Sequence, residues 1–430
     1  MMKHADSGRG VSRRAFLATG AGFGLFNVVP ASVLGANAPS NQVTMALIGA
    51  GGMGMSNMRM FLAMPDVRVL AVCDVNRVKR EHGKAVVDKR YGSKDCAAYR
   101  DFRDVCMRDD VDAVIVATPD HWHAVIGVYA ANCGKDIYGE KPFSHDLREG
   151  RALVRAVERN GRVWQTGSWQ RSRGEMRRAV ELVRNGRIGK IVRVEVGLPG
   201  NGRGPAATPG VPVPDGLDWD MWLGPAPERP FEGVYDWHWR WVSDWGGGQL
   251  MDWIGHHGDI AQWGLGTDRS GPVSFIGSAP DDREGIYDTP KSYKIECEYA
   301  NGVKMTVADC GNGVKMGTKW IGENGEWVWV NRGRFDASSR ALRESRIEAG
   351  EIRLKSPGHQ RQFIDCVKSR AATLTPAEIA HRSASVGHLC RAAIATGRKL
   401  SWDPVAERIV GDDAADCLLQ RPVREPWSLV

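Results

Sequence analysis

Two side chains in one short stretch of the chain are suited to moving a proton. In GGGQLMDWIGHHG, Asp252 and His256 stand four residues apart, a spacing that places both on one face of a helix. An imidazole that is oriented by a carboxylate is a general base near neutral pH. Read alone, the pair is either structural or a proton-transfer pair with His256 as the base and Asp252 as the group that orients it.

A glycine-rich turn upstream predicts a nucleotide cofactor. GAGGMG, residues 49–54, follows the apolar strand VTMALIG and opens a helical pattern. The first glycine permits a tight turn, the second lets the backbone approach a pyrophosphate, and the last lets helix and strand pack closely. The expected phosphate cradle consists of Gly49, Gly51, Gly52, Met53 and Gly54.

The acid that follows this turn indicates which dinucleotide binds. Asp74 ends the second apolar strand about twenty residues after Gly54, where an acid binds a ribose 2′-hydroxyl. A carboxylate repels a 2′-phosphate, so Asp74 favours NAD. Arg77 nearby leaves NADP open as the alternative.

Two more polar stretches end predicted strands at the edge where open parallel sheets bind ligands. ATPDHWH supplies Thr118, Pro119 and His123, and YGEKP supplies Glu140 and Lys141. Read alone, the histidine is a loop residue or a ligand contact, and the lysine is a surface residue or a cation held beside the nicotinamide. We expect all five to line the cofactor site.

Strands and helices alternate over residues 43–165, which predicts a doubly wound parallel sheet of the Rossmann type. Residues 166–374 differ, because hairpin signals at Asn301-Gly302 and Asn324-Gly325 predict a large, mainly antiparallel sheet in an α+β domain. The overall class is α/β with this second domain.

The segment 375–430 is expected to return to the first domain. Thr375 and Glu378 form a capping box with proline between them, which predicts a helix that begins at Thr375 and lies near the cofactor.

The N-terminus resembles an export signal, with a disordered basic tail as the alternative. Arg13 and Arg14 precede a short, glycine-containing apolar run, a pattern typical of twin-arginine signals, and we assign residues 1–38 to the signal and its linker. This predicts an interaction with the export machinery and a periplasmic location, with membrane anchoring if the signal stays uncleaved.

Composition excludes several classes of function. The net charge of +7 comes from 58 basic residues scattered among 51 acidic ones, without the basic and aromatic tracks that bind nucleic acid. Nine cysteines stand singly without any C-x-x-C, so we expect no disulfide framework and no metal site.

With these motifs in order, the chain resembles the Gfo/Idh/MocA family of glucose–fructose oxidoreductase and inositol dehydrogenase over nearly all of its length after residue 42. The resemblance implies that Lys141 is the catalytic lysine, that the Lys141–Pro142 bond is cis, and that Asp252 and His256 form the family's D-x-x-x-H pair. It also implies a homo-oligomer formed through the C-terminal sheet. Asp120 stands where the family often has Asn.

The expected substrate is a carbohydrate. Seven of the sixteen tryptophans lie between Trp219 and Trp253; indoles stack on sugar rings, although we expect at least four of them to be core. The candidate substrate contacts are Gln170, Arg171, Trp241 and His257, with Arg240 and Asp244 as further hydrogen-bonding groups.

Three functions remain open on this basis. The first is an exported NAD(P)-dependent oxidoreductase that acts on a secondary hydroxyl of a sugar, glycoside or cyclitol and holds its cofactor tightly. The second is an NAD-dependent glycoside hydrolase that oxidises, eliminates, hydrates and reduces on the same fold. The third is a non-catalytic sugar sensor. The presence of Lys141 favours the first.

Overall fold

The computed structural model describes residues 41–202 and 204–429. The predicted export signal lies outside these residues. The chain divides into two compact units, residues 1–42 and 43–430, and the fold described below is that of the second unit.

The first sheet has six parallel strands in the order β3-β2-β1-β4-β5-β6. β1 (VTMALI) and β4 (AVIV) are apolar and almost wholly buried, as the central strands of a sheet covered on both faces must be. The bounds are β1 Val43–Ile48, β2 Val67–Cys73, β3 Ala97–Tyr99, β4 Ala113–Val116, β5 Asp136–Gly139 and β6 Trp164–Thr166. This confirms the predicted Rossmann sheet.

Side-chain caps begin α3, α4 and α6 among the helices that connect these strands, whereas α2 and α5 begin without one. Asn76 accepts hydrogen bonds from the backbone N–H groups of Val78 and Lys79 at the start of α3, and Asp146 caps α6 by accepting from Glu149. The bounds are α2 Gly52–Leu62, α3 Arg77–Tyr91, α4 Phe102–Cys106, α5 Asp120–Asn132 and α6 Leu147–Arg159.

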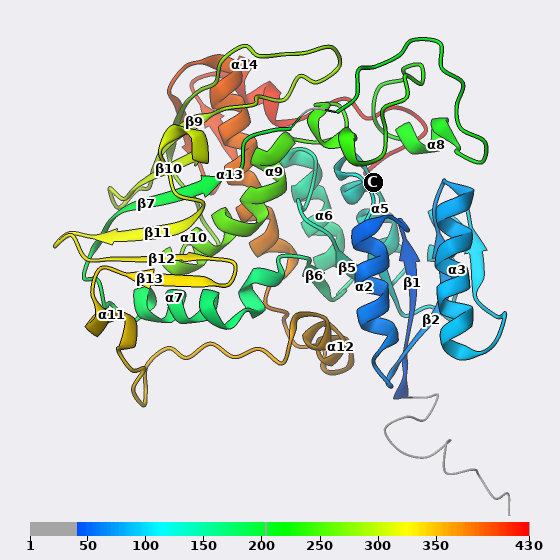
Figure 1. Cartoon of the computed structure of the whole chain (residues 1–430), viewed down its shortest axis with the longest axis horizontal. Helices are drawn as coiled ribbons and strands as arrows, with labels where there is room; N and C mark the ends of the chain where they lie inside the picture. Colours follow the sequence, from blue (N-terminus) through cyan, green and yellow to red (C-terminus); the bar gives the residue numbers. More distant parts are fainter. Residues whose placement is uncertain (1–40, 203, 430) are drawn as a thin grey trace, which may run out of the picture. The chain divides into compact units, whose positions relative to one another are not determined.

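The second sheet has nine strands in the order β13-β12-β11-β7-β10-β9-β8-β14-β15. All its pairs are antiparallel except β7 with β10, and the two predicted hairpins are β9–β10 and β11–β12. Figure 1 shows strands β7 and β9 to β13 of this sheet in green and yellow, beside helices α7, α9 and α10. The bounds are β7 Ile191–Leu198, β8 Ser274–Ser278, β9 Lys294–Glu298, β10 Lys304–Asp309, β11 Gly317–Gly322, β12 Trp327–Asn331, β13 Arg334–Ala337, β14 Leu400–Asp403 and β15 Arg408–Val410.

The remaining helices surround this sheet or lie between the two sheets. The α-helices are α7 Gly174–Arg184, α8 Trp219–Leu223, α9 Gly248–Trp253, α10 Asp259–Leu265, α11 Arg340–Glu344, α12 His359–Ser369, α13 Ala377–Thr396 and α14 Asp413–Asp416. The shorter 3-10 and π turns are η3 Trp169–Ser172, η4 Trp237–Trp241, η5 Ile254–Gly258, η6 Cys310–Asn312 and η7 Cys417–Leu419.

The predicted capping box at Thr375 is wrong. α13 begins at Ala377 without a side-chain cap, and the Thr375 hydroxyl donates instead to the carbonyl of Thr166 at the end of β6, at 2.9 Å. Glu378 forms ion pairs with Arg151 and Arg382. The tertiary contacts of both side chains therefore replace the local cap.

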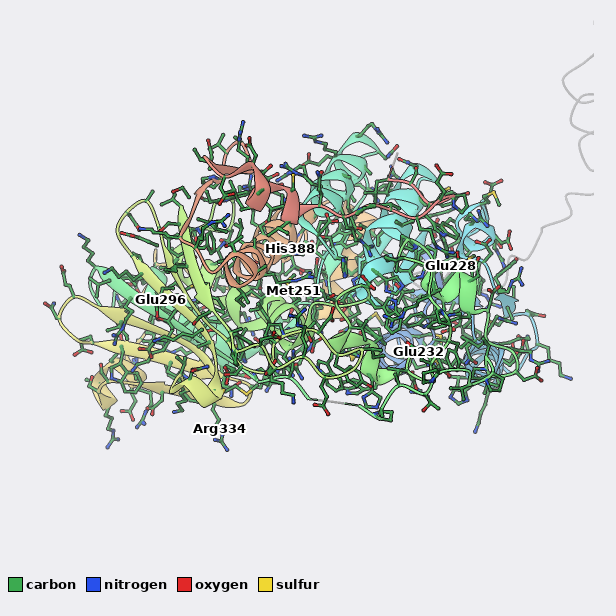
Figure 2. The ribbon with its side chains drawn as sticks, turned by 90° about the horizontal axis from the view of Figure 1, so that it is seen from above. Glu228, Glu232, Met251, Glu296, Arg334 and His388 are labelled. Carbon is green, nitrogen blue, oxygen red and sulfur yellow. The ribbon has the colours of Figure 1, made fainter. Side chains whose placement is uncertain are left out.

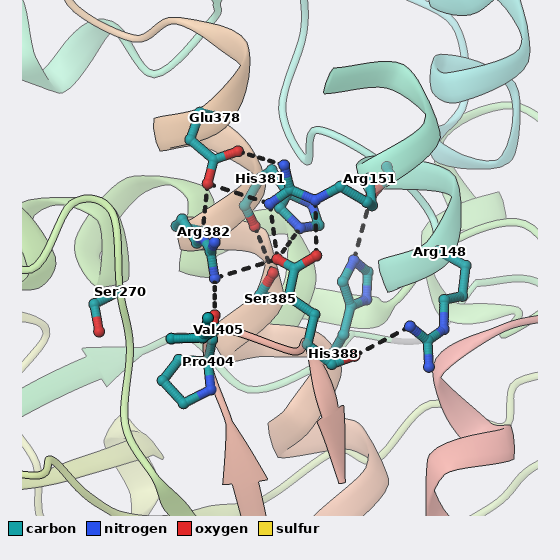
Figure 3. A network of polar contacts seen from close by, with 12 residues as sticks. Arg148, Arg151, Ser270, Glu378, His381, Arg382, Ser385, His388, Pro404 and Val405 are labelled. Carbon is teal, nitrogen blue, oxygen red and sulfur yellow. Dashed lines mark hydrogen bonds and ion pairs between the residues drawn. The ribbon is translucent and has the colours of Figure 1, made fainter. Parts of the chain in front are cut away.

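α13 is joined to α6 of the first domain by a buried polar network. Arg151 of α6 forms ion pairs with Glu378 and Glu407, and His381 of α13 contacts the same Glu407 at 2.7 Å. Figure 3 shows Arg151 facing Glu378, His381 and Arg382 across the two helices. α13 contributes no residue to the lining of the cavity described next.

The C-terminal residues lie against the first domain as well. The Trp427 ring packs edge-on against Trp122 of α5, with ring centroids 4.7 Å apart, and lies 6.0 Å from Phe102 of α4. Within the described residues, no helix has the length and apolar character needed to cross a membrane.

Candidate active site

A cavity of about 320 Å³ opens at the carboxyl ends of β1, β2, β4 and β5. The loops after these strands form one wall, and a segment of the second domain forms the other. The first wall includes the expected cofactor residues Gly49, Gly51, Gly52, Met53, Asp74, Thr118, Pro119, Glu140 and Lys141.

The glycine-rich turn has the geometry that a pyrophosphate requires. Gly49 has a φ of +94°, and a Cβ added there would meet the Ala117 carbonyl oxygen at 2.6 Å. A Cβ at Gly54 would lie 1.9 Å from the Gly49 carbonyl oxygen, so this glycine permits the close packing of α2 on β1. A Cβ added at Gly51 or Gly52 would have no heavy atom within 4 Å. The two glycines stand at the start of α2, and the N-terminus of a helix favours an anion.

Asp74 ends β2 in the position of a ribose-binding acid. Its two carboxylate oxygens accept hydrogen bonds from the backbone N–H groups of Ala50 and Asn76, at 2.7 and 2.8 Å. Burial raises the pKa of this carboxyl, and the two N–H donors oppose that shift. The residue therefore links the phosphate turn to the loop before α3 while lining the cavity.

Residues 216–240, which we call the covering segment, lie over this cavity. The Arg77 N–H donates to the Gly216 carbonyl at 2.8 Å, and Asp218 donates its N–H to the Val75 carbonyl. Lys79 Nζ lies 2.6 Å from Asp236 Oδ1. Figure 1 shows α8 and the green loops around it above the upper ends of α3 and β1. The cavity is lined from this side by Leu217, Met221, Trp222, Tyr235, Asp236, Trp237, Trp239 and Arg240.

Lys141 and Asp252 form an ion pair in the cavity wall, with Nζ and Oδ1 2.5 Å apart. The Lys141–Pro142 peptide bond is cis. Burial alone raises the pKa of Asp252, but the charges of Lys141, Arg240 and Arg332 together hold it below its usual value. Asp252 is therefore a carboxylate surrounded by cations.

The expected pairing of Asp252 with His256 is wrong. α9 ends at Trp253, and the next turn, η5, is a π-helix, whose wider turn breaks the four-residue spacing. His256 Nδ1 is buried without a hydrogen-bond partner. Burial, with the nearby charges of Lys141 and Arg332, keeps the pKa of His256 well below its usual value, so the imidazole is neutral.

Asp120 is a second carboxyl group of the same cavity. It is the first residue of α5 and its side chain is only 4% exposed. Burial and the charge of Asp252 raise its pKa to about 7, against the opposing charges of Lys141 and Arg240. Where the family often has Asn, this chain therefore has a carboxyl group whose pKa is near neutral and on which the charge of Lys141 acts.

His123 does not line the cavity. Its ring nitrogens lie 2.6 Å from the Pro142 carbonyl oxygen and 2.9 Å from that of Thr118. The residue ties together the two loops that carry the lining residues, which is a positioning role and corrects the expected contact. Glu140 does line the cavity, where it accepts a hydrogen bond from Asn57 at 2.8 Å.

The four proposed substrate residues lie outside the cavity lining. Arg171 is fully buried in ion pairs with Asp259 and Asp268, each at 2.7 Å, and so is a structural residue. His257 stacks on Trp253 with ring centroids 5.3 Å apart. The others, Gln170 and Trp241, are buried with polar side-chain atoms that lack partners.

The tryptophan-rich span is mostly core, as expected. Four of the seven indoles are buried: Trp222, Trp239, Trp241 and Trp245. The exception in the cavity is Trp237, which is 56% exposed and carries the Arg240 guanidinium 4.0 Å from its ring centre.

The sequence analysis did not identify two residues near Asp252 and His256, the part of the site that we call the reacting end. Arg332, in the turn after β12, contacts Trp169 of η3. In the sequence, Trp169 lies about 80 residues before Asp252 and Arg332 about 80 residues after it. No local motif marks them, because only the folded chain brings them together. In the part of the chain that the structure describes, no group of three or more His, Cys, Asp or Glu residues is arranged to hold a metal ion.

Comparison with known families gives two matches. Residues 43–168 match the GFO_IDH_MocA "Oxidoreductase family, NAD-binding Rossmann fold", and residues 200–429 match "Oxidoreductase family, C-terminal alpha/beta domain". The second match alone spans more than half of the chain.

Curated relatives are similar over about a third of this chain. A glycosyl hydrolase family 109 protein of Saccharopolyspora erythraea is 34% identical over 154 residues, 35% of this chain and 33% of the relative. A 2,7-anhydro-N-acetylneuraminate hydratase of Mediterraneibacter gnavus is 29% identical over 147 residues, 34% of this chain and 37% of the relative. The chain thus spans about a third of the length of the curated relatives it matches.

Solved structures share the fold at low identity. The WlbA dehydrogenase of Bordetella pertussis, in complex with NADH and UDP-GlcNAcA, has a TM-score of 0.62 and 16% identity, over 84% of this chain and 99% of that one. The aldose-aldose oxidoreductase of Caulobacter crescentus, complexed with glycerol, has a TM-score of 0.61 and 18% identity over the same shares.

Proposed function

The chain belongs to the Gfo/Idh/MocA oxidoreductase family, whose N-terminal domain binds NAD, and we propose that it oxidises a secondary hydroxyl of a sugar, glycoside or cyclitol. The reverse reaction reduces the corresponding ketone. One observation carries this proposal: the Lys141–Asp252 ion pair lines the same cavity as the phosphate turn and Asp74.

The site residues divide the work of this reaction. NAD, when bound, supplies the hydride acceptor. Lys141 presents its ammonium group to the substrate oxygen and stabilises the charge that develops there, and Asp252 fixes the position of that ammonium group. The neutral imidazole of His256 accepts the hydroxyl proton.

The enclosure of the cavity favours a cofactor that stays bound. The covering segment contacts the loop after β2 through backbone hydrogen bonds and through Lys79 and Asp236. We propose that the folded enzyme is exported with its nucleotide through the twin-arginine signal. No pool of nucleotide exists outside the cytoplasm, so each oxidation is followed by a reduction of a second substrate or of the same sugar.

Purification without added cofactor tests this proposal. The protein is expected to carry nicotinamide through gel filtration, and added NAD is expected to stimulate it little. A panel of sugars followed by the absorbance of reduced nicotinamide and by mass spectrometry of new ketones identifies the reaction. An empty protein whose activity saturates simply with added NAD contradicts cofactor retention, and a flat absorbance trace with every sugar favours a sensor.

A redox-neutral glycoside cleavage is the second candidate, because curated relatives are named glycosyl hydrolase family 109 proteins. Such an enzyme oxidises the sugar, eliminates the aglycone, adds water and reduces the product. A panel of 4-nitrophenyl glycosides separates the two candidates. Release of nitrophenol without net ketone formation supports cleavage, whereas accumulation of a keto-glycoside supports the dehydrogenase.

A further inference from the structure

Arg332 is a cation without an acidic partner at the reacting end of the site. It follows β12, and its guanidinium lies 4.3 Å from the ring centre of Trp253 and 4.7 Å from that of Trp169. Among the residues that the structure describes, no carboxylate oxygen comes within 4.0 Å of it. Its Nε is buried without a hydrogen-bond partner. Its direct contacts are ring faces, and the nearest charge that favours its cationic form is the more distant carboxylate of Asp252.

Two histidines complete what we call the indole–arginine cluster. The His256 ring lies 5.7 Å from that of Trp253 and 6.2 Å from that of Trp169, and His257 stacks on the Trp253 indole. His256 is 4% exposed with Nδ1 unpartnered, and both ring nitrogens of His257 are buried without partners. The cluster consists of Trp169, Trp253, His256, His257 and Arg332.

The cluster is continuous with the Lys141–Asp252 pair. A Cβ at Gly255, the residue before His256, would lie 3.2 Å from the Lys141 Cβ. The charges of Lys141 and Arg332 both act on His256 and on Asp252. Arg332 thus lies close enough for its charge to act on both Asp252 and His256, behind the part of the cavity wall that Lys141 and Asp252 form.

Positive charges gather around this position. The charges of Lys141, Arg240 and Arg332 all act on Asp252. Lys141 also acts on the buried carboxyl of Glu140, and Lys141 and Arg240 act on Asp120, whose pKa is raised to about 7. Arg332 differs from the other two, because it has no carboxylate within 4.0 Å among the described residues, and buried charge is costly unless it is paired.

We propose that the substrate is an acidic sugar whose carboxylate binds to Arg332. The proposal rests on the proposed function, because it names the substrate class of that site. A guanidinium that lies over the rings of Trp169 and Trp253 keeps its N–H donors available as a planar fork, which matches a planar carboxylate. The carboxylate would lie beside His256 while the hydroxyl to be oxidised faces Lys141.

Binding measurements test this without requiring turnover. The purified protein is titrated with D-glucuronate, D-galacturonate, D-glucose and glucose 6-phosphate, with the fluorescence of the cluster's indoles and the heat of binding as readouts. At least one uronate is expected to bind about tenfold or more tightly than D-glucose, the usual scale for a charge-assisted contact. High salt should weaken uronate binding, since the contact is ionic.

Two arginine variants provide the matched comparison. Arg332→Gln removes the cation and is expected to abolish the preference for the uronate while leaving D-glucose binding within about twofold. Arg334→Gln, two residues along the chain at an exposed position, is expected to keep the preference. Figure 2 shows Arg334 at the edge of the second sheet, projecting away from the ribbon.

Several results overturn the proposal. These are equal or tighter binding of D-glucose, no binding of either uronate, tighter binding of glucose 6-phosphate than of the uronates, or a preference that survives in Arg332→Gln. If Arg332→Gln fails to fold, the affinities of the wild-type protein for the uronates and for D-glucose decide whether the proposal holds. Uronate binding without any reduction of nicotinamide contradicts the proposed function but leaves the anion site intact.

Discussion

Lys141 and Asp252 lie 111 residues apart in sequence, yet their Nζ and Oδ1 atoms are 2.5 Å apart in the cavity wall. The lysine comes from the loop after β5, and the carboxylate comes from α9. The reacting end of the site is therefore shared by two domains, with Asp252 fixing the lysine and not the histidine.

This pair makes Lys141→Ala and Asp252→Asn the first test of the site. We expect Lys141→Ala to lower turnover by a factor on the order of 10² to 10⁴, the range for a positioned proton-transfer or charge-stabilising group. Asp252→Asn should lower it less, because the ammonium group remains but loses its fixed position. Rates of nicotinamide reduction measure both, with exposed Lys190→Ala as the control. Near wild-type rates for Lys141→Ala contradict the assigned role.

His256 is predicted to act as a neutral base throughout the physiological pH range. Its pKa lies well below the usual value because of burial and of the charges of Lys141 and Arg332. Activity should therefore not fall between about pH 8 and pH 6 through protonation of this ring. His256→Gln should lower turnover by a factor on the order of 10² or more, with a wild-type melting temperature. A rate that titrates in this range in the wild type and no longer does so in His256→Gln disproves the neutral base.

Asp120 should make stability depend on pH in a defined direction. Its pKa is raised to about 7, so the folded protein binds this proton more tightly than the unfolded chain does. The resulting contribution is complete below the unfolded pKa and is lost as the pH rises toward 7, by at most about 1.4 kcal/mol per pH unit. Asp120→Asn removes this dependence.

The melting temperature of Asp120→Asn relative to the wild type should therefore rise between about pH 5 and pH 8. Asp109→Asn, at an exposed position, is the control and should show no such trend. A difference that is constant with pH means that Asp120 does not titrate in this range.

The covering segment should hold the nucleotide mainly through apolar contacts. The Lys79–Asp236 ion pair is partly exposed, and such pairs contribute about 0.2–1 kcal/mol, so Asp236→Asn should speed cofactor release by no more than about fivefold. Leu217 is buried against the cavity, and Leu217→Ala should speed release more, because it removes apolar surface that closes the cavity. Release is measured by trapping the freed nucleotide with a second dehydrogenase. Faster release from Asp236→Asn than from Leu217→Ala reverses this ranking.

Local patterns predicted the parts of the site that depend on local structure. The phosphate turn, Asp74 and Lys141 follow strands whose apolar runs are visible in the sequence, and parallel strands end at one edge. The relation between Asp252 and His256 was not predictable in this way. A four-residue spacing implies one face only in an α-helix, and nothing in IGHHG indicates a π turn.

Contacts between residues that are far apart in the sequence could not be predicted from local patterns either. Thr375 and Glu378 have the types and spacing of a cap, but β6 and Arg151 compete for them with contacts that exist only in the folded chain. Arg171 was expected to face a sugar because it is polar and near the site. The two acids that neutralise it, Asp259 and Asp268, are about ninety residues away.

The contact of Trp427 with Trp122 and Phe102 determines when, during synthesis, the apolar surface of α4 and α5 can be covered. α4 and α5 leave the ribosome some 300 residues before the tryptophan that covers them, so this apolar surface of the nucleotide-binding domain stays uncovered until residue 427 has been made. An exposed apolar surface of this kind favours aggregation of the incomplete chain. A message that ends before codon 427 would yield a protein with that surface permanently open and prone to aggregate.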